Sequence, residues 1–117
     1  MQSTLKANIQ RGLVNCILHP VHNLIIDQLV KLLEETGQYQ RVEKKVEYEI
    51  NGLKGEVDVL GIISENKVHF FEVKCHRHYQ RYIDATNQYY RYCRAHPDKQ
   101  VWGFYICPKL VCEIGEL

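Results

Sequence analysis

The chain has 117 residues, which is enough for one domain with its own hydrophobic core and too few for a second domain. Its 15 lysines and arginines nearly balance its 14 aspartates and glutamates, so a surface that binds phosphate must be a local patch. The first residues lack an apolar export segment, and no apolar run approaches the ~18 residues of a membrane helix. We therefore expect a single cytoplasmic domain, residues 1–117, without membrane contact.

The cysteines are odd in number and include no Cys-x-x-Cys pair, which is typical of reduced thiols inside the cell. Their spacing does not match a cluster-binding motif, so an iron–sulfur cluster is not expected. The five cysteines are Cys16, Cys75, Cys93, Cys107 and Cys112.

The first third of the chain is predicted to be helical. Residues 1–18 suggest a short helix or packed arm, and a stronger helical pattern covers about 20–36, from Pro20 in its first turn to Gly37 as its C-cap. His22 falls on the apolar side of this helix, so we expect it to face inward. A lone histidine in that position is either a hydrogen-bonded core residue or a ligand.

Three strands are predicted to follow. Residues 41–50 alternate between apolar and charged, and the Asn51-Gly52 pair after them is a strong hairpin signal. Two short apolar runs, 57–63 and 68–73, are separated by a polar turn. Together these segments predict an antiparallel meander.

A helix over about 79–95 and an apolar strand over 101–107 come next, followed by a possible short strand over 110–114. A strand, helix, strand sequence favours parallel pairing through a crossover. The expected fold is α/β, with a mixed central sheet made of the meander plus a strand added through the crossover helix, flanked by helices. The residues expected on the buried face of the 79–95 helix are Tyr79, Tyr82, Ile83, Thr86, Tyr90 and Cys93.

Charged residues interrupt the two apolar runs of the meander. Asp58 lies in the first run, Glu72 lies in the second, and Lys74 follows on the same strand face as Glu72. Unpaired buried carboxylates are costly, so such groups are usually paired or bind a metal. Asp58 and Glu72 could hold a hard divalent cation, and Lys74 could position a water for attack on a phosphodiester.

This arrangement resembles the PD-(D/E)XK nuclease superfamily. The matching residues are Asp58 and, fourteen positions later, Glu72-Val73-Lys74, with Val57 in place of the family's proline. The order helix, meander, helix, strand over about 20–107 also matches the family core. The resemblance implies a restriction-endonuclease-like core and a deoxyribonuclease that uses Mg²⁺ or Mn²⁺. Asp58, Glu72 and the Val73 carbonyl would hold the metal, and Lys74 would orient the attacking water.

Two further features resemble the RecB-like branch of this superfamily. His22 stands where that branch carries an extra metal ligand on its first helix. Gln88 and Tyr92 match its Gln-x-x-x-Tyr motif, which would contact DNA, and both could equally be ordinary surface residues. Arg77 and Arg81 could grip phosphate beside the site or lie in a solvated segment.

Several alternatives stay open. Glu56 could support the metal indirectly, through water or through contacts with its direct ligands, or it could pair with Lys54 or Lys74. The enzyme could be a structure-specific endonuclease similar to Holliday junction resolvases, or the domain could be a non-catalytic nucleic-acid-binding module. Its small size favours a homodimer, with the 101–107 strand or the tyrosine-rich helix at the interface.

Overall fold

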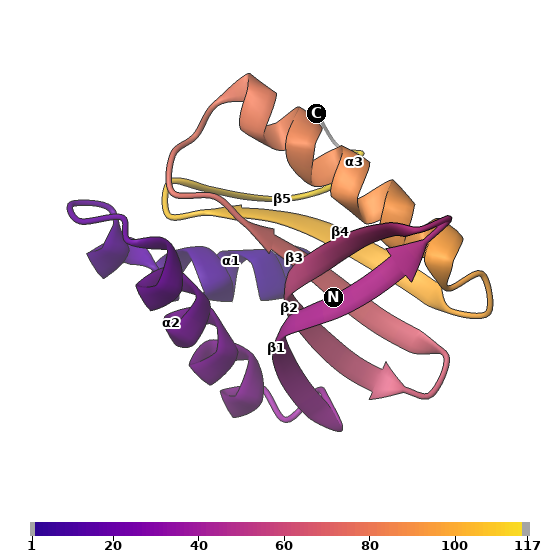
Figure 1. Ribbon diagram of the computed structural model, residues 1–117. Coiled ribbons are helices and arrows are strands. Elements are labelled where there is room, and N and C mark those ends of the chain that lie inside the picture. Colours follow the sequence, from indigo (N-terminus) through magenta and orange to yellow (C-terminus); the bar gives the residue numbers. More distant parts are fainter. Residues whose placement is uncertain (1, 116–117) are drawn as a thin grey trace.

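A five-stranded sheet with helices on both faces organises the chain in the computed structural model, which describes residues 2–115 (Figure 1). In chain order the elements are α1 (Gln2–Gly12), the 3₁₀ turn η1 (Val14–Cys16), α2 (His22–Glu35), β1 (Arg41–Ile50), β2 (Leu53–Ser64), β3 (Lys67–Val73), α3 (Tyr79–Ala95), β4 (Gln100–Cys107) and β5 (Leu110–Glu113).

The predicted α/β fold with a mixed sheet is confirmed. The strands lie in the order β1-β2-β3-β4-β5, and β1, β2 and β3 form the antiparallel meander. β3 and β4 pair in parallel, with α3 as the crossover between them, and β5 returns antiparallel to β4. No helix within residues 2–115 combines the length and the apolar character needed to cross a membrane.

Turn chemistry sets most element boundaries. Asn51 and Gly52 have φ angles of 52° and 79°, as the tight hairpin turn between β1 and β2 requires, so β2 begins at Leu53 instead of residue 57. Gly37, with φ of 68°, follows the last turn of α2, as predicted for a C-cap. The start of α2 was predicted two residues too early, because Pro20 lies outside the helix.

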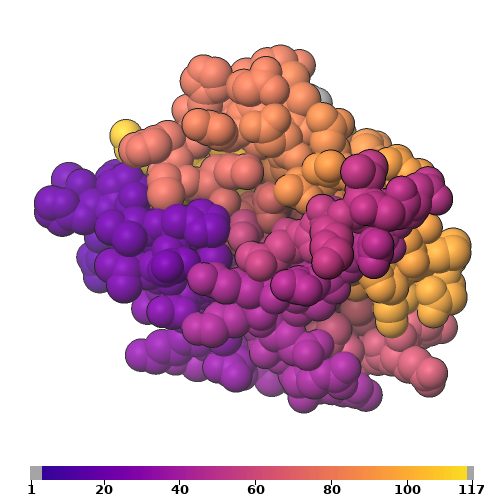
Figure 2. Space-filling model, in the orientation of Figure 1, coloured from indigo at the N-terminus to yellow at the C-terminus, as the bar shows by residue number. Residues whose placement is uncertain are grey.

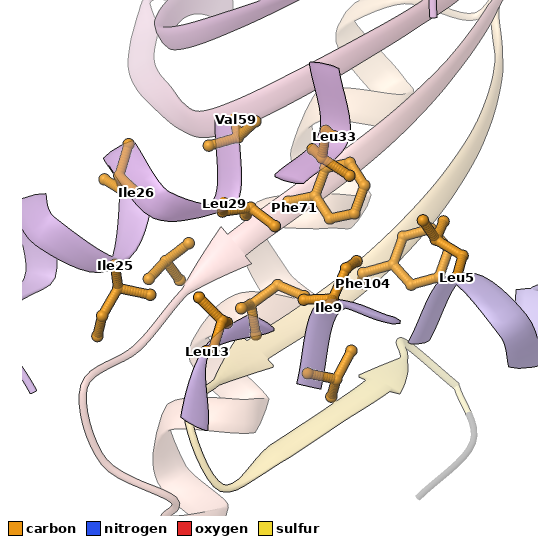
Figure 3. Close-up of a cluster of buried hydrophobic side chains, with 13 residues drawn as sticks. Leu5, Ile9, Leu13, Ile25, Ile26, Leu29, Leu33, Val59, Phe71 and Phe104 are labelled. Atoms are coloured by element: carbon orange, nitrogen blue, oxygen red, sulfur yellow. The ribbon is translucent and has the colours of Figure 1, made fainter. Parts of the chain in front are cut away.

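The main core lies between the sheet and the pair α1 and α2, as Figure 3 shows. Phe71 of β3 and Phe104 of β4 stack with ring centroids 5.1 Å apart, and neither is exposed to solvent. Burial of each such side chain contributes about 1.5–3 kcal/mol. The helix residues that cover this face are Leu5, Ile9, Leu13, Ile25, Ile26, Leu29 and Leu33.

The buried face of α3 differs from the prediction. Tyr79 and Tyr90, expected inside, are 73% and 53% exposed, whereas Ala85 and Tyr92 are buried together with Tyr82. Tyrosines occur on both sides of this helix, so hydrophobicity alone does not identify the side that packs. The small Ala85 lets the helix approach the sheet closely, and that contact fixes which side faces inward.

A backbone irregularity at Lys45 sends the two halves of β1 to opposite faces of the sheet. Lys45 has a φ of 54°, and the pairing goes from Lys44↔Val59 to Val46↔Val57 in an unchanged register, so Lys45 lies opposite Asp58 and no residue is inserted. Consequently Val59 packs under α2 while Val57 packs under α3, although residues two apart normally share a face. Asp58 lies between them, at the point where β2 changes its orientation.

One of the two segments predicted for a dimer interface is an inner strand. β4 lies between β3 and β5, and its residues from Gly103 to Cys107 are buried. Its backbone is paired on both sides. A second copy of the chain therefore cannot extend the sheet at β4, and the homodimer stays a prediction.

Candidate active site

The Asp58 side chain takes the place of one backbone hydrogen bond between β2 and β3. The pairing of β2 with β3 ends at Val59↔Phe71, and beyond it the Val73 N–H donates a hydrogen bond of 2.8 Å to Asp58 Oδ2. The residue is 8% exposed. A carboxylate that accepts a backbone N–H where a carbonyl would otherwise do so lets the two strands separate while the donor stays satisfied.

Glu72 lies beside it on β3 and is 3% exposed. Its Oε1 is buried without a hydrogen-bond partner, and its Oε2 is 3.8 Å from Lys74 Nζ. Burial raises the pKa of Glu72 to about 9, and the neighbouring Asp58 carboxylate adds to the rise while the Lys74 ammonium opposes it. Without a bound cation, Glu72 therefore holds a proton at neutral pH.

His22, the first residue of α2, reaches this pair from the other side. Its Nε2 is 3.0 Å from the Val73 carbonyl oxygen and 3.5 Å from Asp58 Oδ2, and its side chain is 43% exposed. Because a carbonyl can only accept, Nε2 carries the hydrogen in this contact. His22 thus contacts Asp58 and Val73, but its side chain is only partly buried, so the prediction that it faces inward holds in part.

Lys74 is fixed by the strand that follows. It comes immediately after β3, and its N–H donates 2.8 Å to the carbonyl oxygen of Ile106 in β4. The side chain is half-buried and lies on the same side of the strand as Glu72. The ammonium is thus held against the carboxylate pair from a rigid position.

The donor atoms suit a hard divalent cation. Within residues 2–115, no three His, Cys, Asp or Glu side chains approach closely enough to form a metal site by themselves, so a cation here would also need the Val73 carbonyl and water. The unpartnered Oε1 of Glu72 supplies a further free oxygen.

Gln88 and Tyr92 occupy different environments. The Tyr48 hydroxyl donates 2.8 Å to Gln88 Oε1, which joins the β1–β2 hairpin to α3. Tyr92 is 2% exposed and stacks on His96 with centroids 4.4 Å apart. The expectation of a direct DNA contact is therefore corrected for Tyr92, whose ring lies in the core, whereas the half-buried Gln88 lies nearer the surface.

The remaining predicted residues lie at the surface. Arg77 and Arg81 are exposed at the start of α3, and Arg81 lies 3.9 Å from Asp84. Glu56 is exposed and faces Glu47 across the hairpin, and within residues 2–115 it forms no ion pair with Lys54 or Lys74.

Tyr48 is the residue that the sequence did not reveal. It reads as one more apolar position of an alternating strand, and no signal marks it as a contact to α3. The left-handed backbone of Lys45 directs it there. A cavity of about 630 Å³ lies by contrast at the opposite end of β3, where Lys67, His69 and Trp102 help to line it.

Comparisons with known proteins bear on the fold alone. No family model and no curated protein matches the chain. Among solved structures, the chain is similar to the crystal structure of SSO0001, with a TM-score of 0.50 and 20% sequence identity over 78% of this chain. The match spans 46% of that chain, less than half of its length.

Proposed function

We propose that the chain is a metal-dependent nuclease of the PD-(D/E)XK superfamily, RecB-like branch, that hydrolyses DNA phosphodiester bonds. The observation that carries the proposal is the pair of buried carboxylates, Asp58 and Glu72, with Lys74 beside them where β2 and β3 separate. When two buried carboxyl groups are neighbours, the pKa of one of them, here Glu72, rises sharply. A bound cation would offset the negative charge of such a pair.

In this proposal Asp58, Glu72 and the Val73 carbonyl hold Mg²⁺ or Mn²⁺, with His22 as the additional ligand. When bound, the metal offsets the carboxylate charge and stabilises the negative charge that develops on the phosphate. His22 must give up its hydrogen bond to Val73 to present a nitrogen lone pair. Since imidazole suits Mn²⁺ better than Mg²⁺, His22→Ala is expected to reduce activity with manganese most.

Lys74 orients the water that attacks phosphorus. Its ammonium donates hydrogen bonds and accepts none, so it fixes a water oxygen with a lone pair free for attack. Attack forms the new P–O bond while the bond to the leaving deoxyribose oxygen breaks; the water gives its proton to bulk solvent, and the leaving oxygen takes one from solvent. Lys74 beside Glu72 would hold this water close to a cation bound by the carboxylates.

Cleavage of end-labelled DNA tests the proposal. Single-stranded, duplex, flap and four-way-junction substrates are incubated with Mg²⁺ or Mn²⁺ and wild type, Asp58→Ala, Lys74→Ala or the matched surface variant Glu65→Gln. We expect wild type and Glu65→Gln to cut, and the two site variants to lose at least about 10²-fold in rate.

The products also separate the alternatives. Symmetric nicks confined to the four-way junction would identify a resolvase-type enzyme. DNA that is bound equally by every variant but cut by none would contradict a nuclease and favour a binding module.

A further inference from the structure

The chain is nearly neutral as a whole, but it contains a basic segment. Residues 74–96 hold five of the 15 lysines and arginines but only one of the 14 acidic residues. The rest of the chain is accordingly net acidic. Most of the basic segment is α3, which packs beside the β1–β2 hairpin on the face seen in Figure 2.

One side of α3 combines these charges with an exposed ring. Asn87, Tyr90, Arg91 and Arg94 are spaced i, i+3, i+4 and i+7, so they form a single stripe along the helix. They line a shallow hollow of about 410 Å³. Tyr90 is 53% exposed, so its ring is accessible to a planar group of a ligand. We refer to these four residues as the α3 stripe.

The arginines of the α3 stripe have unused donors. Arg91 Nε is buried without a hydrogen-bond partner. Within residues 2–115 neither Arg91 nor Arg94 forms an ion pair with a carboxylate, whereas Arg81, on the same helix, lies beside Asp84. Guanidinium groups that no acid neutralises are suited to phosphate oxygens.

The α3 stripe is continuous with the candidate active site. The Arg91 guanidinium is within hydrogen-bonding reach of the Tyr48 hydroxyl, which in turn donates to Gln88. The ring of Tyr92, next to Arg91 in α3, lies 5.7 Å from the ring of Phe70, which is two residues before Glu72 on β3. The contact of α3 with the hairpin and β3 thus places the α3 stripe near the carboxylates.

We infer that the α3 stripe binds a single-stranded nucleic acid and leads it to the carboxylate site. The inference deepens the proposed function and rests on it for the direction of the path. An exposed tyrosine next to two arginines matches the combination of base stacking and phosphate contact by which proteins hold single strands. In a duplex the faces of internal bases are covered by their neighbours, so Tyr90 would have nothing to stack on.

Binding measured without cleavage tests this inference separately from the proposed function. Fluorescence anisotropy with EDTA present gives the Kd of labelled oligo-dT, oligo-rU and a blunt duplex across a series of salt concentrations. The variants are Tyr90→Ala and Arg94→Gln. The matched controls are Tyr90→Phe, which keeps a ring, and Lys31→Gln, which removes an exposed charge on α2.

We expect tighter binding of the single strands than of the duplex, and the dT and rU arms show which backbone is preferred. Tyr90→Ala should weaken single-strand binding about 5- to 100-fold with an unchanged salt slope, because stacking is uncharged. Arg94→Gln should reduce the slope of log K against log salt by about 0.7. The two controls should bind like wild type.

Three results would overturn the inference: equal Kd values for all variants, an equal loss in Lys31→Gln, or a preference for the duplex. If wild type binds single strands through the α3 stripe but cuts none of the substrates, the inference stands and the proposed nuclease does not. Circular dichroism melting curves establish that each exposed-residue variant is folded.

Discussion

Glu72 is the residue at which stability and function conflict. Its pKa is raised to about 9 from an ordinary 4.5 by burial and by the adjacent Asp58 carboxylate. The folded protein therefore binds one proton more than the unfolded chain between these two values. Stability from this group is fully present below pH 4.5 and is lost as the pH rises towards 9.

We predict that Glu72→Gln stabilises the metal-free protein at pH 8. Glutamine cannot ionise, so the variant avoids the loss of stability that wild type suffers above pH 4.5, and its advantage in the free energy of unfolding should grow by up to about 1.4 kcal/mol for each pH unit towards 9. Urea unfolding in EDTA between pH 5 and 9 measures it. Parallel pH profiles for wild type and variant would refute a proton on Glu72, and the exposed Glu65→Gln serves as control.

His69 has the opposite pH dependence. Burial lowers its pKa to about 4, and its Nδ1 is 2.7 Å from the Tyr39 hydroxyl. Below pH 6.5 the unfolded chain protonates this ring first, so stability is lost as the pH falls from 6.5 towards 4.

We predict that His69→Gln reduces the loss of unfolding free energy between pH 6.5 and 4, although it lowers stability at pH 7 because of lost packing. The exposed His19→Gln should keep the wild-type loss. Urea titrations at pH 4.5, 5.5 and 7 give both slopes. The same slope in all three proteins would show that another group causes the acid sensitivity.

Among single residues, the sequence identified the charged ones that lie in apolar surroundings. Asp58, Glu72 and Lys74 stand out because carboxylates and an amine interrupt apolar runs. Tyr48 and Arg91 do not, since a tyrosine in a strand and an arginine in a helix are ordinary. Their importance comes from a contact between elements, and no local pattern encodes that contact.

Among the elements, β1 shows why the strand faces were hard to predict. Its alternation of apolar and charged residues predicts one buried face from Val42 to Ile50. The left-handed backbone of Lys45 breaks that rule, so Val42 and Tyr48 pack in different cores. A lysine carries none of the signals of a left-handed residue, and the irregularity therefore cannot be predicted from the sequence.

We predict that Lys45→Gly raises the free energy of unfolding by about 0.5–1 kcal/mol. Lysine is strained at a φ of 54°, and glycine is not. The exposed strand residue Glu47 has no such angle, so Glu47→Gly should lower stability by a similar amount. Urea unfolding compares the two. A loss of stability in both variants would mean that the backbone of Lys45 is not strained in solution.

The existence of the helix α3 was easier to predict than its orientation. Its existence and length were predicted well because its start and its end at His96-Pro97 carry strong signals. Its orientation was not, because two sides of the helix carry tyrosines. The consequence is functional: the misassigned Tyr90 is exposed and becomes part of the α3 stripe.

For the whole molecule, the positive charge is concentrated in one segment of the chain. Residues 74–96 are net basic, and the acidic remainder keeps the total at +1. If the α3 stripe binds a polyanion as inferred, such a distribution would steer it to this surface. Composition alone could not reveal this arrangement, because it averages the two regions.

A divalent cation should stabilise the whole fold if the carboxylates bind it. A ligand that binds only the folded state, present at 100 times its Kd, adds about 2.7 kcal/mol to the free energy of unfolding. Because the cation displaces the proton that Glu72 holds below pH 9, its effect should grow as the pH rises from 6 to 8. Differential scanning calorimetry with Mn²⁺ or EDTA measures the shift in Tm. We expect the shift to vanish in Asp58→Asn and to persist in Glu65→Gln, and a shift of equal size in Asp58→Asn would place the cation elsewhere on the protein.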